Sequence, residues 1–172
     1  MKINKKNKSF NNNDQDKFLD LIGSLTYYLK LFSSLKRFLE FVSIVSKHFI
    51  NQEFSLLIPL DEKGQIWFEN ICFSDNHLRD QIILDLQEIF NNNGLFKNFK
   101  LKNINILEKF LEEKFNSFSF KTHKIISRGK CRGFFYVFYK KSDQQKFLLD
   151  SNNINILVSL LAVGIENYLL LK

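Results

Sequence analysis

The residues that could carry chemistry in this sequence are few and far apart. Cys72 and Cys131 have no paired spacing, and His48, His77 and His123 lack the close spacing of metal ligands such as His-Glu-x-x-His. The sequence also contains no phosphate-binding loop, no serine–histidine–aspartate order and no prominent pair of carboxylates. We therefore expect no enzymatic activity, no metal site and no cofactor.

One of the two thiols has a setting that favours reactivity. Arg128, Lys130 and Arg132 flank Cys131, and nearby positive charge lowers the pKa of a thiol. An ordinary solvated basic turn accounts for the same residues. Cys72 lies in a predicted strand, where a buried cysteine behaves as a small hydrophobic residue. The lack of paired spacing argues against a disulfide framework and fits a reducing compartment.

Length and composition indicate one folded domain. The chain has 172 residues, a net charge of +7 and a hydrophobic fraction of 45%, with six glycines and one proline. Such a composition excludes collagen-like and wholly disordered chains. Twenty phenylalanines and abundant lysines and asparagines are typical of A/T-rich codons, so the positive charge is weak support for a polyanionic partner. We expect a disordered basic tail at residues 1–17 and a folded domain at 18–172.

The hydropathy pattern predicts a cytoplasmic protein. The amino terminus has no apolar stretch of the length that a signal peptide needs. The longest uncharged apolar run, residues 154–165, is interrupted by Asn155 and Ser159 and followed by Glu166. We therefore expect no transmembrane span of about twenty residues and no membrane partner.

The first half of the sequence predicts a helix, a hairpin and a second helix. Apolar residues at alternating spacings of three and four predict one long amphipathic helix over residues 18–49. Two β-type runs within residues 54–72, joined by a short Asp/Gly segment, predict a hairpin. A second helix, capped by Ser74 or Asp75, ends at the glycine of residues 91–94.

The second half predicts another hairpin and a final helix. Residues 95–115 are ambiguous and fit either a short helix or a loop. Alternating residues then predict an antiparallel pair of strands at 118–125 and 131–139, separated by a glycine-containing turn. The last helix is capped by Asp150 or Ser151 and continues towards the end of the chain.

Three segments in this layout match a known family. The first strand and turn are Ser-Leu-Leu-Ile-Pro-Leu-Asp-Glu-Lys-Gly at 55–64, and the last strand contains Gly-Phe-Phe-Tyr-Val-Phe at 133–138. The final helix follows a Phe and an acidic cap and contains Gly-Ile-Glu-Asn at 164–167, where the family has Ala-Ile-Glu-Asn. On these residues, the sequence resembles a GAF domain over about residues 25–172.

The resemblance implies both a fold and a function. The implied fold is α+β, with a central antiparallel sheet, long N- and C-terminal helices on one face and a helical insert over the other. GAF domains are regulatory modules that bind small ligands under the insert, and many precede serine phosphatases, histidine kinases or cyclases. We therefore expect a non-catalytic sensory module of bacterial signalling, either freestanding or followed by a C-terminal output domain. The family signatures for cyclic nucleotides and for bilin attachment are missing.

Candidate ligand residues are strand residues that combine an aromatic ring with a polar tip, because such side chains can orient a small molecule. These are Trp67, His123 and Tyr136, with Phe138 as a further lining residue. The sequence does not fix which face of the sheet each of them occupies. If phenylalanine side chains fill the pocket instead, the domain binds no ligand and acts as a dimerisation scaffold.

The terminal helices supply the candidate dimer interface. Their apolar stripes repeat with a period close to 3.5, which suits pairing of helices between two copies, and we expect a homodimer. The candidate interface residues are Leu25, Tyr28, Phe32, Leu35, Leu39, Leu157, Leu161, Ile165 and Tyr168. The same stripes could instead cover the sheet of a single chain.

The aromatic strand supplies an alternative function. Residues 132–139, Arg-Gly-Phe-Phe-Tyr-Val-Phe-Tyr, match most positions of the RNA-recognition octapeptide, whose aromatic side chains stack on unpaired bases. Phe135 departs from that pattern, which has Gly or Ala there. The order of the elements also differs, because no helix separates the first two strands. Because of these two departures, we expect no nucleic-acid partner. Single-stranded RNA binding through this strand remains the alternative function.

Overall fold

The computed structural model describes residues 34–75, 77–94, 99–143 and 151–171, together with a few single residues before Ser34. For His48 it describes the backbone alone. The chain divides into two compact units, residues 1–31 and 32–172. The described residues of the first unit are helical and lie between Asp16 and Ser24. Most of the predicted basic tail and the predicted interface residues Leu25 and Tyr28 lie outside the described residues.

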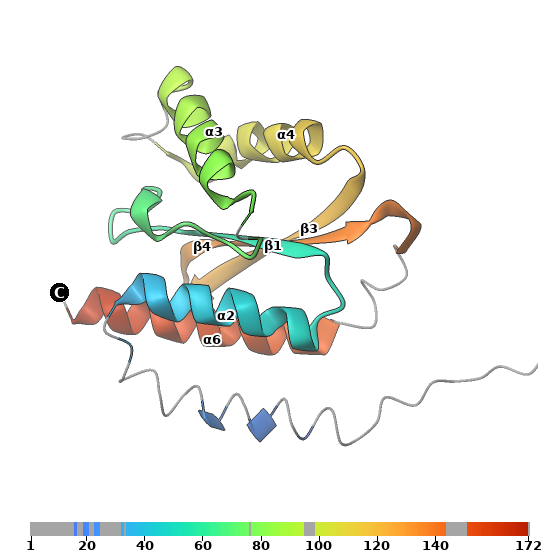
Figure 1. The fold of residues 1–172 in the computed structure, drawn as a ribbon. Coiled ribbons are helices and arrows are strands. Elements are labelled where there is room, and N and C mark those ends of the chain that lie inside the picture. Colours follow the sequence, from blue (N-terminus) through green and yellow to red (C-terminus); the bar gives the residue numbers. More distant parts are fainter. Residues whose placement is uncertain are drawn as a thin grey trace, which may run out of the picture. The chain divides into compact units, whose positions relative to one another are not determined.

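The second unit is built around an antiparallel sheet, which confirms the predicted α+β class. Its strands lie in the order β2-β1-β4-β3. The strands are β1 (Phe54–Pro59), β2 (Cys72–Phe73), β3 (Phe118–Ser127) and β4 (Lys130–Lys140). Helices α2 (Leu35–Phe49) and α6 (Ser151–Leu170) cover one face, and α3 (Arg79–Asn92) and α4 (Ile104–Lys114) lie over the other (Figure 1). We call the segment containing α3 and α4 the insert.

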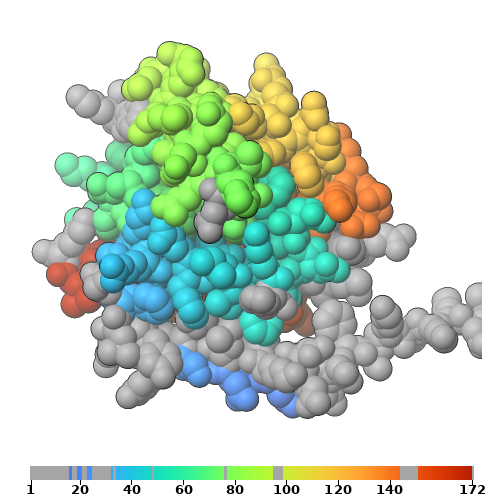
Figure 2. Space-filling model, in the orientation of Figure 1, coloured from blue at the N-terminus to red at the C-terminus, as the bar shows by residue number. Residues whose placement is uncertain are grey.

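Strand β4 is buried on both faces, which explains its nearly continuous apolar sequence. Successive side chains of a strand point to opposite faces of the sheet. Phe134, Tyr136 and Phe138 belong to the core under the insert. Phe135 and Val137 are also fully buried, on the opposite face under α2 and α6. Figure 2 shows the surface from the same side, with α3 and α4 above and α2 below them.

The first terminal helix is shorter than its periodicity predicts. Neither Phe32 nor Ser34 is helical, and α2 begins at Leu35. The prediction of one continuous helix over 18–49 is therefore wrong. The reason is local: the Ser34 side chain accepts a hydrogen bond from the Arg37 amide at 3.3 Å, which makes Ser34 the N-cap of a new helix.

The first hairpin forms, but its second strand is short. Asp61 holds the turn by accepting hydrogen bonds from the amides of Lys63 and Gln65 at 2.9 and 2.8 Å. The chain then makes a 3-10 turn, η2 (Phe68–Asn70), before β2 pairs with β1. The predicted strand over 65–72 is thus mostly replaced by a turn, because the Asn70 amide bonds back to the Trp67 carbonyl.

The insert contains both helices that cover the second face. Helix α3 begins after Leu78, so the predicted caps Ser74 and Asp75 are wrong. The Ser74 hydroxyl instead accepts a hydrogen bond from the Ser55 amide at 2.7 Å, which ties β2 to β1. The ambiguous segment 95–115 contains α4, which buries Leu107 and Leu111. Its first part, at 95–98, lies outside the described residues.

The second hairpin and the final helix agree with the sequence. Strands β3 and β4 pair from Phe118↔Lys140 to Ser127↔Lys130, with a register shift between Ile125 and Ile126. Helix α6 begins at Ser151, and the other predicted cap, Asp150, lies outside the described residues. By length and composition α6 could cross a membrane, but this is weak evidence because a buried core helix has the same character.

A buried ion pair joins α6 to the hairpin. The Arg132 Nε donates a hydrogen bond to Glu166 Oε2 at 2.7 Å, and the Arg132 Nη2 donates one to Glu166 Oε1 at 3.2 Å. Both residues are buried, and Arg128 and Ser127 at the hairpin turn also contact the Glu166 carboxylate. The hydrogen bonds from Arg132, aided by its charge, lower the pKa of Glu166 below its ordinary value of 4.5.

Helices α2 and α6 approach closely because of one glycine. A side-chain carbon on Gly164 would lie 2.1 Å from the Phe38 ring, which is itself fully buried. Alanine, the residue of the family pattern at this position, therefore does not fit beside Phe38. The departure from that pattern lets the Phe38 ring pack against the α6 backbone.

We expect Gly164→Ala to destabilise the protein by about 1–3 kcal/mol through overpacking. This loss is expected even though alanine has a higher intrinsic helix propensity than glycine. Urea unfolding measures this loss. Val163→Ala, at an exposed neighbouring position, is the control. Adding Phe38→Leu should recover part of the loss, and a purely additive double variant would contradict the proposed contact.

We expect Glu166→Gln to lower the free energy of unfolding by about 3 kcal/mol at pH 7, because Arg132 would remain buried without its counter-charge. A carboxylate with a lowered pKa stabilises the fold above its ordinary pKa, and this contribution is lost as the pH falls below 4.5. The difference between wild type and variant should therefore shrink towards pH 3. Glu113→Gln, which removes an exposed pair with Lys109, should change stability by less than about 0.5 kcal/mol at either pH.

Candidate functional site

The structure distributes the four predicted ligand residues over three places. Tyr136 and Phe138 are buried under the insert. His123 pairs with Phe135 and points to the opposite face, towards α2 and α6. Trp67 is half-buried at the start of η2. Strand parity therefore separates His123 from Tyr136, although the two residues lie on neighbouring strands.

The space under the insert is filled by the protein's own aromatic rings. Phe54 is central to this packing, with the Phe138 ring stacked at 4.5 Å and the rings of Phe115 and Phe118 at 5.0 and 4.9 Å. The Phe99 and Phe134 rings meet further along the sheet. Side chains thus occupy the volume where the resemblance implied a ligand. Tyr136 and Phe138 are fully buried core residues here.

Two of the predicted ligand residues, Tyr136 and His123, each have a buried polar atom without a hydrogen-bond partner among the described residues. Burial raises the pKa of Tyr136, and its hydroxyl has no hydrogen-bond partner among the described residues. Burial and, to a smaller extent, the charge of Lys121 lower the pKa of His123 to about 4, so its ring is neutral at pH 7. The His123 Nε2 also lacks a partner within the described part of the chain. The two atoms lie on opposite faces of the sheet and cannot form one site.

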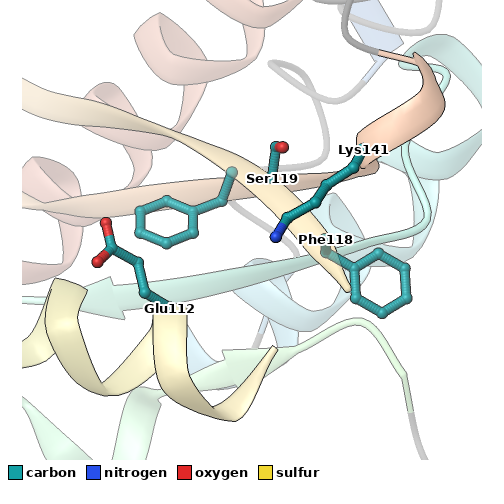
Figure 3. Close-up of a pocket in the computed structure, with 5 residues that line it drawn as sticks. Glu112, Phe118, Ser119 and Lys141 are labelled. Atoms are coloured by element: carbon teal, nitrogen blue, oxygen red, sulfur yellow. The ribbon is translucent and has the colours of Figure 1, made fainter. Parts of the chain in front are cut away.

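A hollow of about 440 Å³ lies at the edge of the sheet, between α4 and the start of β3. We call it the edge hollow. Its lining residues are Glu112, Phe118, Ser119, Phe120 and Lys141. Figure 3 shows Glu112 rising from α4 on one side and Lys141 reaching across β3 from the other. The edge hollow therefore combines a carboxylate, an ammonium group and an aromatic floor.

The floor of the edge hollow is anchored in the core. The Phe120 ring lies 5.3 Å from Phe138 and 5.8 Å from Tyr136, and Phe118 packs edge-on against Phe54. Next to it, the Thr122 hydroxyl donates to Glu108 Oε1 at 2.8 Å and joins β3 to α4. These contacts fix the two elements that carry the hollow.

A second hollow, of about 510 Å³, lies where η2 meets α2 and α3. Its lining residues are Lys36, Ile66, Trp67, Phe68, Glu69, Ile83 and Gln87. The Trp67 indole donates to Glu69 Oε1 at 2.8 Å, so this carboxylate is already engaged. Beside the hollow, Arg79 of α3 pairs with Glu40 of α2 at 2.9 Å. Here a predicted ligand residue, Trp67, does line an open hollow.

Several predicted dimer residues belong to the core of the single chain. Leu35, Leu39, Leu157, Leu161 and Ile165 are all buried between the helices and the sheet. The Tyr168 hydroxyl donates to the Phe32 carbonyl, so these two residues contact each other within one chain. The outward faces of α2 and α6 carry other apolar residues, namely Phe41, Ile44, Val163 and Leu170.

The octapeptide 132–139 has no exposed aromatic face. All of its residues are buried, and Arg132, its first residue, is paired with Glu166. Stacking on bases needs rings that nucleic acid can reach. The burial argues against RNA binding through this strand. No group of three potential metal ligands occurs among the described residues.

Neither cysteine has the environment of a reactive thiol. Burial raises the pKa of Cys72 from 9.0 to about 12. Burial also raises the pKa of Cys131, against the weaker opposing effects of the Gly133 backbone and Lys124. Arg132, which the sequence places beside Cys131, is directed instead to Glu166. The flanking positive charge therefore does not activate the thiol.

Comparisons with known proteins leave the family open. A scan against models of protein families, a search of curated proteins and a search of solved structures each found no match.

Sequence reasoning missed Glu112 and Lys141. Glu112 stands in the ambiguous segment 95–115 and is followed by Glu113, which looks equivalent in the sequence but pairs with Lys109. Lys141 stands in a segment that reads as a polar loop. Only a confident assignment of α4, with the helical positions of Leu107 and Leu111 turned inward, would have placed Glu112 next to β3.

We expect both thiols of the folded protein to react with an aromatic disulfide reagent at pH 8 at least roughly tenfold more slowly than in urea, because the thiolate is the reacting form. Absorbance of the released thiolate measures the rates. Cys131→Ser removes one of the two reacting groups and assigns the remaining rate to Cys72. Rapid labelling of Cys131 in the folded protein would contradict the raised pKa.

Proposed function

We propose that this protein is a non-catalytic, GAF-like sensory or regulatory module that binds a small ligand or a partner and controls a signalling output. The observation that carries this proposal is the position of the edge hollow on the same hairpin that is ion-paired to α6. Phe118 and Phe120 line the hollow on β3, and Arg132 on β4 holds Glu166 of α6. The proposal thus links a binding site to a terminal helix through one continuous pair of strands.

The linkage works through differential binding. A ligand shifts a conformational equilibrium when it binds one state better than the other. A ligand in the edge hollow would contact both α4 and β3, and would favour the arrangement in which these two elements close on it. Because β3 pairs with β4 over its whole length, a shift of β3 would be passed to Arg132 and then to α6.

We further propose that the module dimerises through the outward faces of its terminal helices. Ile44 and Val163 are about half exposed, at 53% and 48%, and Phe41 and Leu170 extend the same faces. Apolar residues in such positions favour an isologous contact between two copies. The output domain would follow α6, which ends at Leu170. Dimerisation and output would then share one helix.

A second candidate function is a dimerisation scaffold without a ligand. The specific observation that favours it is the aromatic filling under the insert, where the rings of Phe54, Phe115 and Phe138 pack against one another. In that case the helices alone carry the function.

Native mass spectrometry of the purified protein tests these proposals. We expect a dimer that retains a small-molecule mass, and a bare dimer would favour the scaffold. The double variant Ile44→Glu/Val163→Glu should be monomeric, because each partner would bury charge in the interface. Leu84→Glu, on the exposed side of α3, is the matched control and should leave the dimer intact. A wild-type monomer without ligand would contradict both proposals.

A further inference from the structure

We propose that the edge hollow binds a small zwitterion, of the class of free α-amino acids, through Glu112, Lys141 and the two phenylalanine rings. This inference rests on the proposed sensory function and names the ligand class. It follows from the charges that reach into the hollow, the aromatic floor between them and the size of the space. Each of these features is a property of the described residues.

Two opposite charges in the hollow are left without a partner. Neither Glu112 nor Lys141 has a hydrogen bond or an ion pair within the described part of the chain. The neighbouring charges on the same elements are engaged. Glu108 bonds Thr122, Glu113 pairs with Lys109, Lys114 pairs with Asp85, and Lys140 pairs with Glu53.

The two charges come from different elements and converge on one space. Glu112 belongs to α4, and Lys141 belongs to η4 (Lys141–Asp143), directly after β4. Figure 3 shows them on opposite sides of the hollow. A ligand with one charge would satisfy only one of these groups. A ligand with an ammonium and a carboxylate group would satisfy both, with its ammonium at Glu112 and its carboxylate at Lys141.

The floor suits the remaining parts of such a ligand. A cation is attracted to the face of an aromatic ring, which strengthens the binding of an ammonium group beside Glu112. An apolar side chain can pack on the same rings. Phe118 and Phe120 are held by Phe54 and Phe138, so a ligand meets a surface that is already ordered. The volume of about 440 Å³ is in the range of small-ligand sites.

Calorimetric titration of the full chain with free phenylalanine, leucine and glutamine tests the inference. For each amino acid, the N-acetyl derivative lacks the ammonium group and the amide derivative lacks the carboxylate. We expect at least one free amino acid to bind and both of its derivatives to bind at least tenfold more weakly. Binding by no free amino acid, or equal binding by the derivatives, would overturn the inference.

Two variants assign the charges. Glu112→Gln should remove the preference for the free amino acid over its N-acetyl derivative, and Lys141→Gln should remove the preference over the amide. Glu113→Gln and Lys140→Gln are matched controls at the neighbouring positions, and they should keep both preferences. Loss of a preference in the controls, or its survival in the site variants, would show that Glu112 and Lys141 are ordinary solvated charges and would overturn the inference.

The failure of this inference can be told apart from the failure of the sensory function. A retained ligand of another chemical class, still bound by the Glu112→Gln and Lys141→Gln variants, would overturn the inference and leave the sensory function standing. Amino-acid binding at the edge hollow that leaves the dimer and the hydrogen exchange of α6 unchanged would support the inference and contradict the sensory function.

Discussion

The ion pair between Arg132 and Glu166 is the interaction on which the arrangement of this domain depends. Two buried charges must remain together, because separating them would leave each without compensation in a medium of low polarity. The pair therefore fixes the position of α6 along the β3–β4 hairpin. Gly164 stands two residues earlier and fixes the contact of α6 with Phe38 of α2. Two residues of α6 that lie less than one helical turn apart thus fix its position, one against the sheet and the other against α2.

Aromatic packing decides where a ligand can be bound. Rings from β1, β4 and the insert close the centre of the sheet, and two hollows lie towards its margins, at the edge hollow and beside Trp67. The edge hollow lies between α4 and β3, and α4 itself contributes Leu107 and Leu111 to the core. The hydrogen bond from Thr122 to Glu108 holds α4 to β3 beside the edge hollow. The domain therefore has a packed aromatic centre with a hollow beside it whose two walls are joined by a hydrogen bond.

Local pattern was enough to predict the second hairpin, the first strand and turn of the first hairpin, the final helix and the α+β class. It failed where pairing between strands, or a single local hydrogen bond, decides the outcome. The face occupied by His123 depends on its pairing with Phe135, which alternation within β3 alone cannot assign. The break before Leu35 depends on a single hydrogen bond from the Arg37 amide to the Ser34 side chain, which is weaker than the periodic signal around it. Glu112 differs from Glu113 only through the surface that each meets after folding.

The outer edge of strand β3 affects how readily the protein aggregates at high concentration. It is a long strand at the end of the sheet order, with no strand beside its outer side in the described part of the chain. Such an edge is a template for pairing with other chains, which leads to aggregation. Lys121 and Lys124 are exposed on β3, and the irregularity at Ile125 and Ile126 distorts the strand near its end. Charge and distortion together discourage such pairing, so these lysines protect solubility.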